Sequence, residues 1–224
     1  TAMARVADNV ECTLNGLRLT FHGNSGSLLR MEYPGVGVLL KAESERASII
    51  DLAYPYHTTF EPLRMASRFS TGVAITKTSD SVVLHWDSLG MSWDYARELP
   101  GRVSATVTFR AASDGRSVLV NCVIRNDSEN TIRQVLFPDF WGIQPIGGEA
   151  DFEFRCCGFA KKPFVDLKRP ERGDAAPYYE NHVSGTLQTS SGGYFPTSPM
   201  IARWFDLGSL KGGLSVFHRV WSRD

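Results

Sequence analysis

The chain has 224 residues, of which 42% are hydrophobic and 21% charged, and its 24 Lys and Arg residues balance its 24 Asp and Glu residues. A zero formal charge without a basic stripe argues against nucleic acid as a partner, because phosphate binding needs clustered cations. No apolar run reaches the roughly 18 residues of a transmembrane helix, so no membrane partner is expected. A chain of this length buries roughly 70% of its unfolded surface, and it needs no disulfide or metal for stability.

Neither the first residues nor the cysteines identify the cellular compartment. The stretch Thr1–Arg5 lacks the apolar core of a signal peptide, although prior removal of a signal would be consistent with an extracytoplasmic location. The four cysteines show neither a CxxC spacing nor the framework of a disulfide-rich domain, and we expect them to be reduced: Cys12, Cys122, Cys156 and Cys157.

Alternation of apolar and polar residues dominates the first hundred residues and is typical of half-buried strands. Short polar turns separate the alternating runs. We expect two hairpins here, one formed by residues 17–21 and 28–33 and the other by residues 73–77 and 82–86.

The most regular alternation follows at residues 103–110, which we expect to form a strand. Ser113-Asp114-Gly115 provides a turn, and residues 117–125 return as the next strand. A second polar turn at 126–130 leads into the apolar run 131–137, which we expect to complete a further hairpin.

The six residues Phe137–Gly142 hold three aromatic side chains, one acid, a proline and a glycine. Asp139 follows a predicted strand and lies beside Trp141, which is an arrangement that can bond a sugar hydroxyl while the indole stacks on the sugar ring. The alternative is that Asp139 caps a turn, because Asp after Pro commonly accepts hydrogen bonds from nearby backbone N–H groups.

Tryptophans divide into two expected groups. Trp86 and Trp204 lie within alternating runs and are expected in the core. Trp93 and Trp141 border predicted loops, and we expect their large apolar surfaces to face a ligand or a neighbouring domain.

The second half contains a long loop at about residues 160–181, rich in charge and proline, after which a strand pattern resumes at 182–189. Long loops on a rigid β scaffold often carry function. Residues 199–207 and 214–221 are expected to form a last strand pair. Because soluble proteins seldom leave such an edge unpaired, we expect the natural protein to continue beyond this chain.

Strands that recur roughly every 8–12 residues, with no helical periodicity, predict an all-β, antiparallel two-sheet sandwich. We expect a single domain over residues 1–224, as the N-terminal portion of a longer protein.

Three stretches resemble the N-terminal β-supersandwich of large bacterial glycoside-hydrolase-like proteins, which has the galactose-mutarotase-like fold. They are "VECTLNGLRLTFHGNSGSLLRMEYPG", "RNDSENTIRQVLFPDFWGIQP" and "YFPTSPMIARWFDLGSLKGGLSVFHRVW". The resemblance implies a supersandwich that either lacks its last strands or is followed by a (β/α)-barrel.

The resemblance also implies a function. Catalytic carboxylates would lie in the barrel beyond Asp224, and the sandwich would support that catalytic domain and shape its sugar-binding cleft. The implied partners are an oligo- or polysaccharide and the C-terminal barrel of the same polypeptide, and no cofactor is implied. Two alternatives stay open: a stand-alone carbohydrate-binding module, and a mutarotase-like aldose epimerase.

No catalytic residue is assigned from the sequence. Epimerases of the resembled family use a His acid and a Glu base, and Glu180 and His182 are the nearest candidates, although Val183-Ser184-Gly185 follows where mutarotases carry Tyr-Phe-Asn. No spacing among the acids singles out a glycosidase pair, and no histidine has a partner at metal-ligand spacing. The candidate contacts to carbohydrate or a second domain are Trp93, Asp139, Trp141 and His182.

Overall fold

The computed structural model describes residues 8–53, 64–92, 102–132, 134–148, 151, 153–156, 159–161, 182–183 and 204–217. Within these residues every strand pairing is antiparallel, and the helical structure is one short 3-10 helix, η1 (Ser67–Phe69). The all-β antiparallel class expected from the alternation is therefore confirmed. No helix among the described residues has the length and apolar character needed to cross a membrane.

The first sheet forms from the N-terminal residues in the order β1-β2-β3-β4. Asn15 and Gly16 join the first two strands with positive φ angles of 48° and 83°, the conformation of a tight hairpin turn. The expected pairing of residues 17–21 with 28–33 is confirmed. The strands are β1 (Val10–Leu14), β2 (Leu17–Phe21), β3 (Leu28–Tyr33) and β4 (Gly37–Lys41).

The second sheet has the order β11-β10-β8-β7 and contains both hairpins expected between residues 73 and 125. Asp114 fixes the turn between the two longest strands, because its carboxylate accepts hydrogen bonds from the backbone N–H groups of Arg116 and Ser117, both at 2.8 Å. The strands are β7 (Ala74–Lys77), β8 (Ser81–Trp86), β10 (Val103–Ala111) and β11 (Val118–Asn126).

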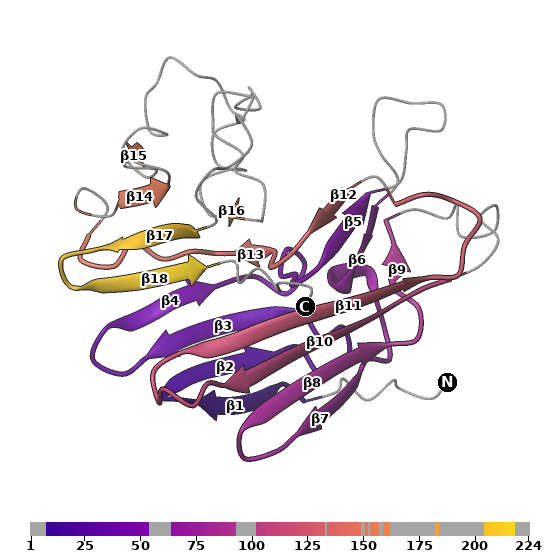
Figure 1. The fold of residues 1–224 in the computed structure, drawn as a ribbon, viewed down its shortest axis with the longest axis horizontal. Coiled ribbons are helices and arrows are strands. Elements are labelled where there is room, and N and C mark those ends of the chain that lie inside the picture. Colours follow the sequence, from indigo (N-terminus) through magenta and orange to yellow (C-terminus); the bar gives the residue numbers. More distant parts are fainter. Residues whose placement is uncertain are drawn as a thin grey trace, which may run out of the picture.

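These two sheets pack face to face, with the core between them (Figure 1). Phe21 of β2 meets Phe109 of β10 edge to face, with ring centroids 5.2 Å apart. Trp86 is buried as expected, and its indole N–H donates to the Ser25 carbonyl at 2.8 Å. The alternation thus predicts both the strands and the faces they bury.

The third sheet, in the order β12-β5-β6-β9, corrects one expectation. β12 pairs with β5 and not with β11, so residues 117–137 do not form a hairpin. The Asn126 side chain donates to the Asn130 carbonyl at 2.7 Å and shapes a turn that sends the chain to another sheet. The strands are β5 (Asp51–Ala53), β6 (Arg64–Ala66), β9 (Gly90–Met91) and β12 (Gln134–Leu136).

The remaining strands form two smaller groups. β13 (Phe140–Trp141) pairs with β16 (His182–Val183). The last sheet has the order β15-β14-β17-β18 and includes the expected C-terminal strand pair: β14 (Glu153–Cys156), β15 (Phe159–Lys161), β17 (Trp204–Ser209) and β18 (Gly212–Phe217). The expected long loop at about 160–181 lies, after Lys161, outside the described residues.

Candidate functional site

The segment Phe137–Gly142 joins two sheets through its backbone. The Asp139 N–H donates to the Ile49 carbonyl at 2.9 Å, just before β5. Three residues later the Gly142 carbonyl accepts from the Lys41 N–H at 2.7 Å, at the end of β4. The Phe137–Pro138 peptide bond is cis. The segment is therefore held at both ends and not free at a sheet rim.

Asp139 and Trp141 are both buried, with exposed fractions of 0% and 8%. The Trp141 Nε1–H donates to Asp139 Oδ2 at 3.1 Å, so the polar atom of the indole is satisfied inside the protein. The expectation that the Trp141 ring is exposed is therefore wrong. A bordering loop suggests exposure, but a buried carboxylate that accepts the indole N–H allows the ring to be enclosed.

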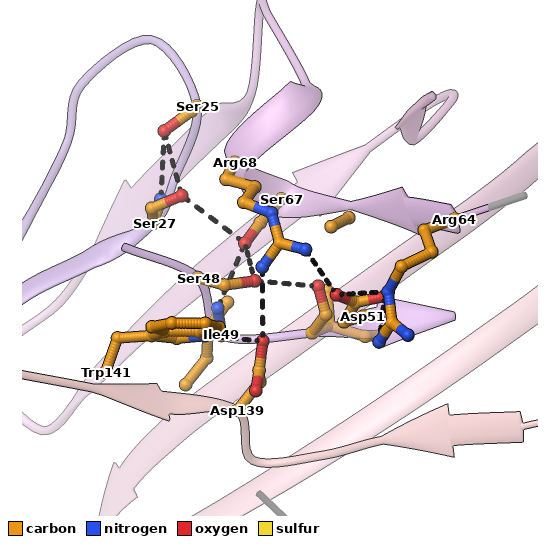
Figure 2. A network of polar contacts seen from close by, with 12 residues as sticks. Ser25, Ser27, Ser48, Ile49, Asp51, Arg64, Ser67, Arg68, Asp139 and Trp141 are labelled. Atoms are coloured by element: carbon orange, nitrogen blue, oxygen red, sulfur yellow. Dashed lines mark hydrogen bonds and ion pairs between the residues drawn. The ribbon is translucent and has the colours of Figure 1, made fainter. Parts of the chain in front are cut away.

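Arg68 lies between two buried carboxylates (Figure 2). Its Nη2 donates to Asp51 Oδ2 at 2.8 Å, and its Nη1 lies 3.9 Å from Asp139 Oδ2. Its guanidinium carbon is 5.6 Å from the centre of the Trp141 ring and 4.7 Å from that of Phe69, within the range of cation–π attraction.

Asp51 has a second cationic partner, because Arg64 Nε donates to both of its carboxylate oxygens at 3.0 and 3.1 Å. Burial raises the pKa of Asp51 above its ordinary value, while the charges of Arg64 and Arg68 oppose that rise. Two arginines and two aspartates thus form one internally compensated group of charges, which is how proteins accommodate buried ions.

A chain of serine hydroxyls continues this network toward the first sheet (Figure 2). Ser67 Oγ accepts the Ile49 N–H at 3.0 Å and lies 3.1 Å from Ser48 Oγ. Ser27 Oγ donates to Ser67 Oγ at 3.4 Å, and Ser25 Oγ donates to Ser27 Oγ at 3.0 Å. Residues far apart in sequence are therefore joined through one buried polar network.

Chemically, this network is suited to positioning. A glycosidase pair needs two carboxyl groups that reach opposite sides of a bound sugar. Asp51 and Asp139 instead face Arg68 and are almost fully enclosed. Their environment fixes the course of the chain from β12 into β13.

A shallow basin of about 600 Å³ lies on the outer face of the first sheet and is reached by Lys77 of β7. Arg30 donates to Glu32 at 2.9 and 3.1 Å, and Lys77 Nζ donates to the Glu11 carbonyl at 3.0 Å. Planar carboxylate and guanidinium groups suit hydroxyl-rich ligands. The residues that line the basin are Glu11, Cys12, Thr13, Arg18, Leu19, Thr20, Arg30, Glu32 and Lys77.

The basin is not predictable from the sequence. Its signal is the charged and threonine residues at alternate positions of three successive strands, which the alternation assigns to a solvent-facing surface without showing that the surface is hollowed.

The other expected contact residues divide between described and undescribed parts of the chain. β16 pairs with β13, so His182 lies opposite Trp141 in the strand register. Trp93 and Glu180 lie outside the described residues. Among the residues that the structure describes, no group of three or more His, Cys, Asp or Glu side chains is arranged to hold a metal ion.

No protein-family model and no curated protein sequence matches the chain. Among solved structures, the chain is similar to a galactose mutarotase related enzyme from Lactobacillus acidophilus. The TM-score is 0.47 and the identity 11%, over 93% of this chain and 75% of that chain.

Proposed function

We propose that this chain is the supersandwich domain of a carbohydrate-active, glycoside-hydrolase-like protein. In this proposal it supports a catalytic domain and shapes its sugar-binding cleft, and it does not break bonds itself. The resemblance of three sequence stretches to such domains and the antiparallel all-β architecture support the proposal.

The observation that carries the supporting role is the fixed segment Phe137–Gly142. Backbone hydrogen bonds attach it to Lys41 and Ile49. Inside the protein, Arg68 faces the Asp139 carboxylate, which in turn accepts the Trp141 indole N–H. A support domain needs such a rigid junction, since a cleft wall that moves by an ångström loses its complementarity to the sugar.

The test is an activity survey of the purified chain on aryl glycosides, oligosaccharides and freshly dissolved monosaccharides. The proposal predicts no hydrolysis and no accelerated anomer equilibration by the chain itself. Turnover that scales with chain concentration, and that survives removal of trace contaminants, would refute the supporting role.

The register between β13 and β16 favours a second candidate, a mutarotase-like epimerase. It pairs His182, the expected acid of such an epimerase, with Trp141 of β13. Glu180, the expected base, lies two residues before His182 in the chain. This candidate predicts faster anomer equilibration that disappears in His182→Ala and persists in His85→Ala, a histidine at 44% exposure on the second sheet. Equal rates in the chain, in both variants and in buffer would eliminate it.

The basin on the first sheet favours the third candidate, a carbohydrate-binding module, because its lining offers paired donors and acceptors to vicinal hydroxyls. Titration calorimetry against a broad oligosaccharide panel tests it. Weaker oligosaccharide binding to Arg18→Ala than to the unmodified chain supports a site in the basin. If an oligosaccharide changes the tryptophan fluorescence of the unmodified chain and of Arg18→Ala equally, the result points to Trp93 instead.

A further inference from the structure

Strand β11 lies at the edge of its sheet, and its hydrogen bonds show which of its backbone groups are used. The Asp127 N–H donates to the Arg102 carbonyl at 2.8 Å, and the Ala112 N–H donates to the Ser117 carbonyl at 2.9 Å. Both bonds join directly opposite residues in the continuous register of β10 and β11. In an antiparallel pair such bonded positions alternate along the strand. The odd-numbered residues of β11 therefore bond to β10.

The even-numbered residues of β11 direct their N–H and C=O groups away from β10, toward the open edge. For Val120, Cys122 and Ile124 none of these backbone groups has a hydrogen-bond partner among the residues that the structure describes. A row of unpaired donors and acceptors at a long sheet edge is a template for another strand.

Side chains along this edge are apolar and only partly covered. Val118, Val120, Cys122 and Ile124 pack against the core but are not fully enclosed. Soluble proteins usually protect such an edge with a charge, a proline or a bulge, and none of these four positions carries a charged residue or proline. The pairing with β10 also runs over nine residues without a shift in register.

We propose that the β11 edge accepts an extended segment of a partner polypeptide as an additional antiparallel strand. The repeat of the free backbone groups fits an extended peptide, which presents its own N–H and C=O groups at the same spacing. The partner residues that face the core side are uncharged and apolar, because a charge beside Val120 and Ile124 would be partly buried without a counter-ion.

A second copy of this chain does not fit as the occupant. β4 and the hairpin β17–β18 extend past β11 on the side away from β10, as Figure 1 shows. If two copies joined their β11 edges into one continuous sheet, these extensions would occupy the same space. A slender strand avoids that overlap.

Cys122, at the centre of β11, provides a direct test by disulfide trapping. The probe is a synthetic peptide with the sequence of β10, VSATVTFRA, in which the position of Val107 is cysteine. Val107 is the native partner of Cys122 in the strand register, so the same register on the free edge places two cysteines opposite each other. Directly opposite bonded residues lie about 5.5 Å apart between Cα atoms, within the range of a disulfide.

The matched control peptide carries its cysteine at the position of Thr108 instead, on the opposite face of the added strand. In a thiol redox buffer we expect the first peptide to form about tenfold more mixed disulfide with Cys122 than the control peptide. This ratio corresponds to a free-energy difference of about 1.4 kcal/mol. Peptide mapping by mass spectrometry assigns the site. Equal yields of the two peptides would overturn the proposal.

The variant Val120→Pro removes one outward N–H without removing a bond to β10, and it should lower the trapping yield severalfold. A yield that does not fall in a folded variant contradicts the proposal. Hydrogen exchange of the unmodified chain provides a measurement that needs no variant. The amides of Val120, Cys122 and Ile124 should exchange rapidly alone and slowly with the peptide, whereas slow exchange in the chain alone would show that the edge is already covered.

Discussion

Arg68 shows how single residues hold this fold together. It faces Asp51 at 2.8 Å and Asp139 at 3.9 Å, and 13% of its side chain is exposed. In such surroundings the loss of one partner leaves an uncompensated buried charge, which costs much more than the intact pair contributes.

Asp51→Asn is therefore expected to lower the free energy of unfolding by about 3–5 kcal/mol, because Arg64 loses its counter-ion and Arg68 loses the nearer of its two carboxylates. Urea denaturation measures the change. The matched control is Asp127→Asn, which breaks the exposed pair with Arg125 and should cost less than about 1 kcal/mol. Similar losses in the two variants would contradict the role given to the buried network.

Asp114 provides a prediction about pH. Hydrogen bonds from Ser117 and Arg116 lower the pKa of its carboxyl from 3.8 to about 2. Because the folded state binds the proton less tightly than the unfolded state, this carboxylate contributes stability above pH 3.8, and the contribution is lost as pH falls toward 2. Carboxyl NMR should show the low midpoint, and Ser117→Ala should raise it; a midpoint unchanged by that substitution would exclude Ser117 as the cause.

The sequence marks Asp139 and Trp141 as unusual, but the exposure expected for Trp141 is wrong. The acid and the indole are close in sequence, so their proximity is predictable. Arg68 is not, since it approaches Asp139 only after β5, β6 and β12 have assembled into one sheet. Long-range ion pairs leave no local spacing from which to predict them.

At the scale of elements, the close approach of β13 to β4 depends on Gly142. Its φ is +74°, and a Cβ there would lie 2.1 Å from the Lys41 carbonyl oxygen. An alanine would thus meet both an unfavourable backbone conformation and the neighbouring strand.

Gly142→Ala is expected to destabilise the chain by about 3 kcal/mol or more. Gly35→Ala is the control, because Gly35 has a similar φ of +85° but nothing within 4 Å of its Cβ position, and should cost about 1 kcal/mol. Thermal or urea unfolding of both variants separates backbone strain from the collision. Equal effects would mean that the approach to Lys41 is not important for stability.

Local pairings were predictable and distant ones were not. The hairpins β2–β3, β7–β8 and β10–β11 follow from alternation around short polar turns. β12 has the same alternation, but its partner is β5, more than eighty positions earlier in the chain. The polar turn after β11 has the same kind of sequence whether the chain returns to pair with β11 or crosses to another sheet.

For the whole molecule, alternation predicts the antiparallel sandwich because half-buried strands with this period have few other ways to cover their apolar faces. It does not predict the hollow on the outer side of the first sheet or the position of β11 at the edge of its sheet, because both depend on how the strands assemble. We propose these two surfaces as contact sites, the first for a sugar and the second for another polypeptide.

If Phe137–Gly142 is a fixed buried junction that supports the sandwich, and not a surface whose acid binds a ligand, stability must depend on the charge of Asp139. The most direct test is the free energy of unfolding of Asp139→Asn, which keeps an oxygen acceptor for the Trp141 N–H but removes the charge facing Arg68. For a buried junction we expect the free energy of unfolding to fall by about 3 kcal/mol. Unchanged stability, together with loss of an oligosaccharide response that the unmodified chain shows, would contradict it.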